Sequence, residues 1–188
     1  MFNDDLSVVV GCGGSGKTSA LYSFSEILNS DNGVAWIYFN KNYGLGENFK
    51  KVSSYQFRID SYGLGELPIT QLSNDIKTIE IIKEYIERGK IDYLIIDDFD
   101  IININLHKII LDLEVKKIIS INFDINGYYD SKKYDILNKY KQTFYNLNIH
   151  DQMKSKTIII NNEILQLEDY ITSLKRESKL NNLLDEKG

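Results

Sequence analysis

Cysteine and arginine are scarce in this chain, and each shortage excludes a structural or functional class. The single cysteine, Cys12, excludes a disulfide within the chain and fits a reducing compartment. Arginine occurs only at positions 58, 88 and 176, too few for the arginine-rich lid of a small-molecule kinase. The sequence has no run of 18 apolar residues and no signal-peptide pattern, so we expect a cytoplasmic protein without a membrane span.

Charge and size narrow the possibilities further. The net charge of −5 argues against a broad electrostatic surface for nucleic acid and leaves a local basic patch open. Hydrophobic residues make up 43% of the 188 residues, which is enough to build a buried core. We therefore expect residues 1–188 to form a single domain.

Apolar runs and helical patterns alternate along the chain. The apolar runs predict buried strands over residues 6–10, 34–39, 55–59, 93–98, 117–122 and 157–161. Helices are expected over residues 19–28, from Pro68 to Gly89, and over about 131–147. Apolar strands that alternate with helices predict an α/β fold, in which a mainly parallel sheet carries helices on both faces. A ligand of such a sheet binds at the carboxyl ends of the strands.

Residues 11–18 form a complete phosphate loop, G-x-x-x-x-G-K-T, between an expected strand and an expected helix. The motif reads Gly11-Cys12-Gly13-Gly14-Ser15-Gly16-Lys17-Thr18 and is followed by Ser19. Its glycines let successive backbone N–H groups point inward and bind a phosphate, with the positive end of the next helix behind them. Lys17 then reaches the β- and γ-phosphates, and the Thr18 hydroxyl is a ligand to Mg²⁺. The motif predicts binding of ATP with Mg²⁺ in a three-layer P-loop NTPase fold.

A second part of the site is predicted where the strand over residues 93–98 closes on two acids. Asp97 has the position of a Walker B aspartate, whose carboxylate holds the Mg²⁺ water shell opposite the phosphate loop. Asp98 either orients the attacking water or is a polar strand end, and the sequence leaves both interpretations open. The candidate catalytic residues are Lys17, Asp97 and Asp98, and the candidate metal ligands are Thr18 and Asp97.

The loop and the order of elements resemble the MinD/ParA group of P-loop ATPases, which includes the CpaE/TadZ proteins. The group spells its loop K-G-G-x-G-K-T, which this chain matches except at Cys12. The group's D-x-D-x-G-L segment corresponds to residues 40–45, and its adenine-contacting asparagine corresponds to Asn161. The resemblance implies a homodimer or a protein partner controlled by the nucleotide state. Because asparagine replaces both aspartates of that segment, we expect slow hydrolysis and better-preserved binding.

The two adjacent acids also resemble RecA-like and AAA+ ATPases, in which an apolar strand ends in a pair of acids. In that case Asp98 is the catalytic base, and Asn122, at the end of the following strand, senses the γ-phosphate. Residues 157–167 then form a hairpin that turns at Asn161 and Asn162. This alternative implies a motor or loader that acts on DNA. The MinD/ParA-like interpretation comes first, and the sequence leaves both open.

Two further observations concern packing. Apolar residues follow three- and four-residue steps near the end of the chain, at Ile164, Leu167, Ile171 and Leu174. They predict a helical stripe over residues 164–176 that packs against the domain or a second subunit, beginning later if residues 163–167 form a strand. His107 and His150 have no metal-ligand spacing and are expected to be surface or cap residues.

Overall fold

The computed structural model describes residues 5–11, 14–29, 32–39, 52–61, 68–122, 142–149, 156–160 and 163–185. Eight strands in these residues form one sheet. Their bounds are β1 Leu6–Gly11, β2 Val34–Phe39, β3 Tyr55–Ile59, β4 Tyr93–Ile96, β5 Lys116–Asn122, β6 Gln142–Ile149, β7 Lys156–Ile160 and β8 Glu163–Gln166. The order is β3-β2-β4-β5-β1-β6-β7-β8, parallel from β3 to β6 and antiparallel from β6 to β8.

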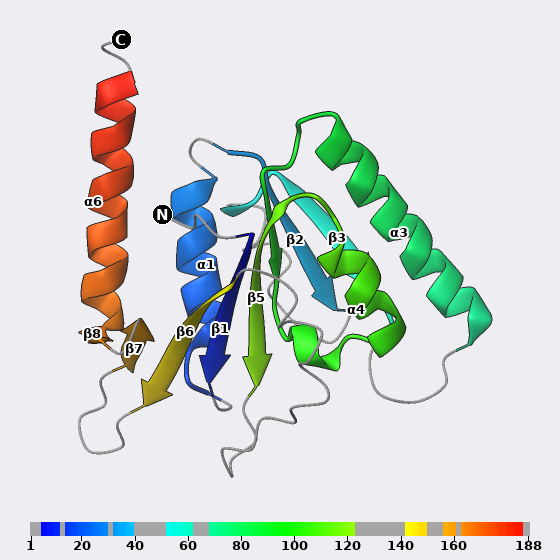
Figure 1. Ribbon diagram of the computed structural model, residues 1–188, viewed down its shortest axis with the longest axis horizontal. Helices are drawn as coiled ribbons and strands as arrows, with labels where there is room; N and C mark the ends of the chain where they lie inside the picture. Colours follow the sequence, from blue (N-terminus) through cyan, green and yellow to red (C-terminus); the bar gives the residue numbers. More distant parts are fainter. Residues whose placement is uncertain are drawn as a thin grey trace.

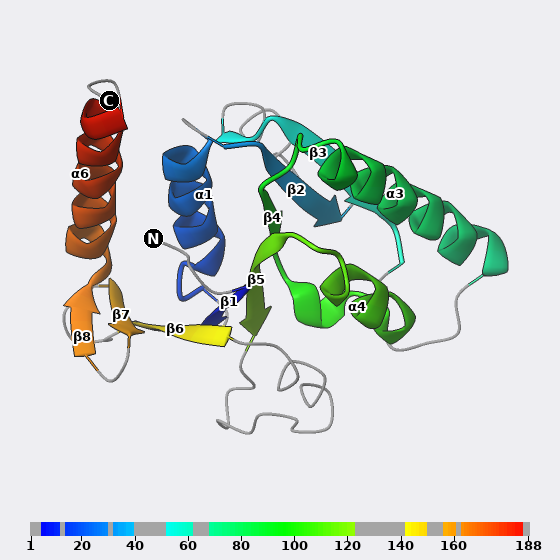
Figure 2. The same cartoon turned by 45° about the horizontal axis from the view of Figure 1, so that its top comes forward.

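Helices cover both faces of this sheet. They are α1 Lys17–Leu28, α3 Ile69–Glu87, α4 Ile104–Leu111 and α6 Leu167–Asp185, with a short 3₁₀ turn, η1, at Phe99–Ile101. Helices α1 and α6 lie on one face, and α3 and α4 lie on the other (Figures 1 and 2). The predicted α/β class, with a mainly parallel sheet between two helical layers, is confirmed. Within the described residues, no helix is both long and apolar enough to cross a membrane.

Successive residues of the buried strands belong to two separate cores. In β1, Val8 packs in the core under α3 and α4, whereas Val9 packs in the core under α1. Ile96 and Ile95 of β4 divide in the same way, and all four side chains are fully buried. Because side chains alternate between the faces of a strand, two covered faces require an apolar residue at nearly every position. This is why these strands read as continuous apolar runs.

Helix α3 has the two boundaries that the sequence predicts. Pro68, at the N-cap, has an extended ψ of 131° and turns the chain into the helix. Gly89, just past the end, has a φ of +63°, a left-handed conformation that favours glycine after a helix. Between them, Ile79 and Ile82 are buried against the sheet.

The helix predicted over about 131–147 is wrong in the part that the structure describes. Residues 142–149 form β6, which pairs in parallel with β1 along the edge opposite β5. The segment consists largely of threonine, aromatic residues, asparagine and isoleucine, which are poor helix formers, and its β-branched and aromatic residues are enriched in strands. Residues 131–141 lie outside the described residues.

The two strands before the last helix form the hairpin that the RecA-like alternative predicts. β7 pairs antiparallel with β8, and Ile160 is opposite Glu163, which leaves a two-residue connection. The turn residues themselves, Asn161 and Asn162, lie outside the described residues. The predicted hairpin is therefore confirmed, and it adds an antiparallel edge to an otherwise parallel sheet.

The apolar stripe consequently begins at Leu167, with α6, rather than at residue 164. Leu174 is buried in the core under α1, and the Tyr170 ring meets the Phe24 ring edge to face, with 6.3 Å between centroids. Of the two packing partners expected for this stripe, the structure shows the domain itself.

Helix α4, which carries His107, is not among the helices predicted from the sequence. His107 is 2% exposed, and its Nε2 lies 3.1 Å from the carbonyl oxygen of Phe99. The imidazole also stacks on the Phe99 ring, with 4.4 Å between centroids. The expectation of a surface or cap histidine is wrong for His107, because packing against η1 buries it. His150 lies outside the described residues.

Candidate nucleotide-binding site

The predicted phosphate loop leaves the sheet at the end of β1 and enters α1. Gly14 and Gly16 have φ values of +77° and +94°, a left-handed conformation that glycine adopts without strain. Gly16 is also the N-cap of α1 and has no side chain, so the first N–H groups of the helix receive no side-chain cap. An anion is the usual partner of such a helix start. Cys12 and Gly13 lie outside the described residues.

The buried side chain of Lys17 connects the two ends of the loop through a hydrogen bond. The side chain is 6% exposed, and its Nζ donates a hydrogen bond of 2.9 Å to the carbonyl oxygen of Gly11. Ser15 is fully buried, and its Oγ has no hydrogen-bond partner among the described residues. A buried hydroxyl without a partner is costly, which fits a loop completed by a ligand. Ser19, in the first turn of α1, is exposed.

Thr18 and Asp97 connect the loop to the acidic end of β4. Thr18 Oγ1 donates a hydrogen bond of 2.6 Å to Asp97 Oδ2, and Asp97 is 2% exposed. Burial raises the pKa of Asp97, because the charged form loses water. Hydrogen bonds from Ser120 and Thr18 act in the opposite direction, since they stabilise the carboxylate. A cation bound beside Asp97 would favour the charged form of this buried carboxyl.

Ser120, on β5, holds both acids at the end of β4. Its Oγ donates a hydrogen bond of 2.5 Å to Asp97 Oδ1 and accepts one of 2.8 Å from the backbone N–H of Asp98. Ser120 is fully buried, and it pairs in register with Val9 of the loop strand. The hydroxyl therefore fixes the position of the acids relative to the phosphate loop.

Asn122, two residues further along β5, contacts the carboxylates of Asp98 and Asp100. Its Nδ2 donates a hydrogen bond of 3.1 Å to Asp98 Oδ1, and its backbone N–H donates one of 3.2 Å to Asp100 Oδ1. Asn122 lies opposite Gly11 in the β1–β5 register. Ser120 and Asn122 share one face of β5 because they are two positions apart.

Asp98 has an unusual backbone conformation. Its φ is +51°, and among the described residues it is the one residue other than glycine with a positive φ. A left-handed residue with a Cβ costs about 1–2 kcal/mol, and such strain is concentrated at functional sites. The strained backbone turns the chain sharply from β4 into η1, with Asp98 as its N-cap.

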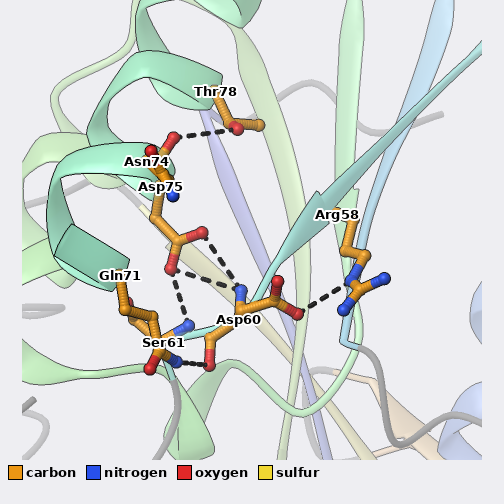
Figure 3. Close-up of polar contacts among 7 residues, drawn as sticks. All are labelled: Arg58, Asp60, Ser61, Gln71, Asn74, Asp75 and Thr78. Atoms are coloured by element: carbon orange, nitrogen blue, oxygen red, sulfur yellow. Dashed lines mark hydrogen bonds and ion pairs between the residues drawn. The ribbon is translucent and has the colours of Figure 1, made fainter. Parts of the chain in front are cut away.

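A second buried carboxylate, Asp75 of α3, lies at the end of the edge strand β3 (Figure 3). It accepts hydrogen bonds of 3.1 and 3.2 Å from the backbone N–H of Asp60 and one of 2.6 Å from that of Ser61. The carbonyl oxygen of Ser61 in turn accepts a hydrogen bond of 3.1 Å from the N–H of Asn103, the N-cap of α4. Since these contacts are all to backbone groups, Asp75 fixes the chain where it leaves β3.

The structure brings Lys17, Thr18, Asp97 and Asp98 together at the carboxyl edge of the parallel strands. Asn161, predicted from the MinD/ParA resemblance to contact adenine, lies outside the described residues. Ser120 was not predicted as a site residue. Its signal was a polar residue inside an apolar strand, two positions before Asn122 and therefore on the same face.

Within the described ranges, no group of three or more histidine, cysteine, aspartate or glutamate residues has the arrangement of a metal site. Mg²⁺ is usually bound through one or two carboxylates together with substrate phosphates. Thr18 and Asp97, both oxygen donors in contact with each other, are the residues that would hold it.

No protein-family model matches the chain, and no curated protein matches its sequence.

Proposed function

We propose that this protein binds ATP with Mg²⁺ at the phosphate loop and hydrolyses it. The hydrogen bond of 2.6 Å between Thr18 Oγ1 and Asp97 Oδ2 carries the proposal. It joins the hydroxyl that follows the loop lysine to the aspartate that ends an apolar strand, and each was predicted as a Mg²⁺ ligand. Both are oxygen donors, which Mg²⁺ prefers.

Two features of the loop support a phosphate ligand. The start of α1 presents N–H groups that no side chain caps, and Ser15 Oγ is a buried hydroxyl without a partner in the described residues. Lys17 is already inside the loop and exchanges the carbonyl oxygen of Gly11 for phosphate oxygens when ATP binds. Mg²⁺ held by Thr18 and Asp97 would supply positive charge to balance that of the phosphates.

In the proposed reaction Asp98 accepts the proton of the attacking water. Its side chain is half-buried, and a carboxylate in this setting is a general base once it is within hydrogen-bond reach of the water. Asn122 donates to Asp98 in the structure, and in the complex its amide is shared with the γ-phosphate. Ser120 keeps the backbone N–H of Asp98 and the carboxylate of Asp97 in fixed positions.

The β7–β8 hairpin supports the RecA-like alternative, under which residues 157–167 were expected to form a hairpin. The paired acids after β4 agree with it, because Asn122 of β5 donates a hydrogen bond to Asp98 as a residue beside the γ-phosphate would. An ATPase motor or loader that acts on DNA is therefore our first candidate.

A MinD/ParA-like switch is the second candidate, and the spelling of the loop over residues 13–18 favours it. In that case ATP produces a homodimer or a complex with a protein partner, and turnover is slow. Residues 40–45, which carry much of this resemblance, lie outside the described residues. Both candidates act in the cytoplasm, where ATP is available.

Binding and turnover of ATP test the proposal separately. Binding is measured by competition against a fluorescent ATP analogue with Mg²⁺, and turnover by phosphate release with and without single- and double-stranded DNA. We expect Lys17→Ala to weaken binding at least about tenfold, because a charged contact to phosphate is lost. Asp98→Asn is expected to keep binding and to lower turnover about 100-fold or more, as loss of a general base does.

The matched control is Lys77→Ala, which removes an exposed lysine from α3 and should change neither quantity. Equal ATP affinity in wild-type protein and Lys17→Ala would overturn the proposal. Stimulation of turnover by DNA supports the motor or loader. ATP-dependent dimers without DNA stimulation, seen by mass measurement in ATP and in ADP, support the switch.

A further inference from the structure

A groove runs between α3 and α4, on the face of the sheet opposite α1. It encloses about 670 Å³, and its apolar lining comes from Ile76, Ile79, Ile86, Ile109 and Leu113. Ile79 and Leu113 also belong to the core beneath the two helices. The floor of the groove is therefore the outer surface of the hydrophobic core, fixed in place by the sheet.

Exposed apolar side chains gather on the same two helices. Among the described residues, the large apolar side chains that are exposed are Ile69, Ile81, Ile104 and Ile109, at 84%, 47%, 55% and 39%. Two belong to α3 and two to α4. Ile109 is the one of these four that lines the groove, where it adds an exposed apolar side chain. The other three are exposed singly, which is ordinary.

The rim of the groove is strongly acidic. Four exposed carboxylates line it, at Glu80, Glu87, Asp112 and Glu114. Lys83 is the one basic residue in the lining, and its Nζ lies 3.8 Å from Glu87. The excess of negative charge around an apolar floor selects a ligand with apolar residues on one side and basic residues beside them.

We propose that this groove docks a basic amphipathic helix of a partner protein. The stretch of α3 from Ile76 to Glu87 is about 17 Å long at the rise of a helix, which matches a partner helix of about three turns. In this mode apolar residues at i, i+3, i+4 and i+7 fill the groove, and lysine or arginine residues beside them meet the acidic rim. The inference is independent of ATP binding.

Two other occupants are disfavoured by charge and by position. A second copy that presented the same groove would bring two acidic rims together, which costs free energy in a symmetric contact. Helix α6 of the chain itself lies on the opposite face, where Lys175 Nζ is 2.8 Å from Glu26 of α1. A partner helix with basic flanks has neither difficulty.

A pair of synthetic peptides tests the proposal. Each has about 15 residues, a length at which an isolated helix begins to form, with leucine at the groove-facing positions and either lysine or glutamate elsewhere. Binding is followed by the methyl NMR signals of isoleucine in the full chain. We expect the lysine peptide to shift the signals of Ile76, Ile79, Ile86 and Ile109 in preference to Ile27 and Ile118 of the other core. The glutamate peptide should leave all of them in place.

Charge reversal identifies the groove as the site. Glu80→Lys with Glu114→Lys is expected to weaken binding of the lysine peptide by about tenfold, and added salt should weaken wild-type binding. The matched control is Asp169→Lys with Glu177→Lys on α6, which changes the net charge equally at exposed positions of the opposite face. Equal weakening in both double variants would overturn the proposal, because binding would then follow net charge alone. Shifts of the groove methyls with protein concentration, without peptide, would also overturn it in favour of a second copy.

Discussion

Thr18 and Asp97 are hydrogen-bonded at 2.6 Å, although 79 positions separate them in the chain. The contact crosses the sheet, since Thr18 follows β1, Asp97 follows β4, and β5 lies between these strands. Ser120, on the intervening strand β5, donates a hydrogen bond to the other carboxylate oxygen, Asp97 Oδ1, and so holds the carboxylate in place. The fold thus places the two candidate Mg²⁺ ligands in direct contact.

Substitution of Thr18 tests the proposed role of its hydroxyl as a Mg²⁺ ligand. Thr18→Ala should weaken ATP binding about tenfold in Mg²⁺, because the loss of one oxygen ligand costs roughly 1.4 kcal/mol. Thr18→Ser keeps the hydroxyl and should bind ATP like the wild type. Titrations in Mg²⁺ and in a chelator check the prediction. An equal loss of affinity in the chelator would mean that Thr18 acts without the cation.

The Ser120→Ala variant tests whether the positions of Asp97 and Asp98 matter more for turnover than for ATP binding. The buried hydroxyl has a partner on each side, so its loss should lower the free energy of unfolding by about 1–3 kcal/mol. Turnover should fall more than ATP affinity, because the backbone N–H of Asp98 loses the nearer of its two acceptors and Asp97 loses a hydrogen bond. Urea titration and phosphate release measure the two effects.

Ser7→Ala is the matched control for Ser120→Ala. Ser7 is 1% exposed on the neighbouring strand β1, and its Oγ has no hydrogen-bond partner among the described residues. We expect this variant to keep the stability and turnover of the wild type. If the two alanine variants behave alike, the contacts of Ser120 contribute nothing specific.

Asp75→Ala should destabilise the fold by about 2–4 kcal/mol, because buried backbone N–H groups of two residues lose their acceptor. Urea denaturation followed by fluorescence measures it well, since Trp36 is the single tryptophan and is fully buried. Asn74→Ala, one position earlier and exposed, is the control and should stay near the wild type. A loss below 1 kcal/mol, well under the estimate, would contradict the structural role of Asp75.

The strands and the loop could be predicted because their signals are local. Residues 55–59 were predicted with the bounds of β3, and the strand predicted over residues 93–98 begins with β4 and ends two residues beyond it. Both were found because buried parallel strands read as apolar runs. β6 could not be read in this way, because half of its residues are polar and its place beside β1 is set by long-range pairing. Ser120 was missed for the same reason: its role depends on β5 lying between β1 and β4, and strand order is not written in any local segment.

Lys117 gives the fold a predictable response to alkaline pH. The side chain is 4% exposed at the amino end of β5, where its Nζ donates hydrogen bonds of 2.5 and 2.8 Å to the carbonyl oxygens of Leu113 and Val115. Burial lowers the pKa of Lys117 to about 8, because the ammonium loses water, while Asp5 and Asp112 partly offset the effect.

The sign of the response follows from proton binding. Between about pH 8 and pH 10.5 the unfolded chain holds a proton on Lys117 that the folded chain has released. The free energy of unfolding therefore gains from this group as the pH rises through that window, by up to about 3 kcal/mol. Lys117→Met lacks the group, so the stability of the wild type relative to this variant should rise between pH 7 and pH 11, and urea titrations along that range measure it. Lys108→Met removes an exposed lysine and reports the effect of net charge alone. A constant difference between wild type and Lys117→Met across the range would show that the ammonium is not buried in the folded protein.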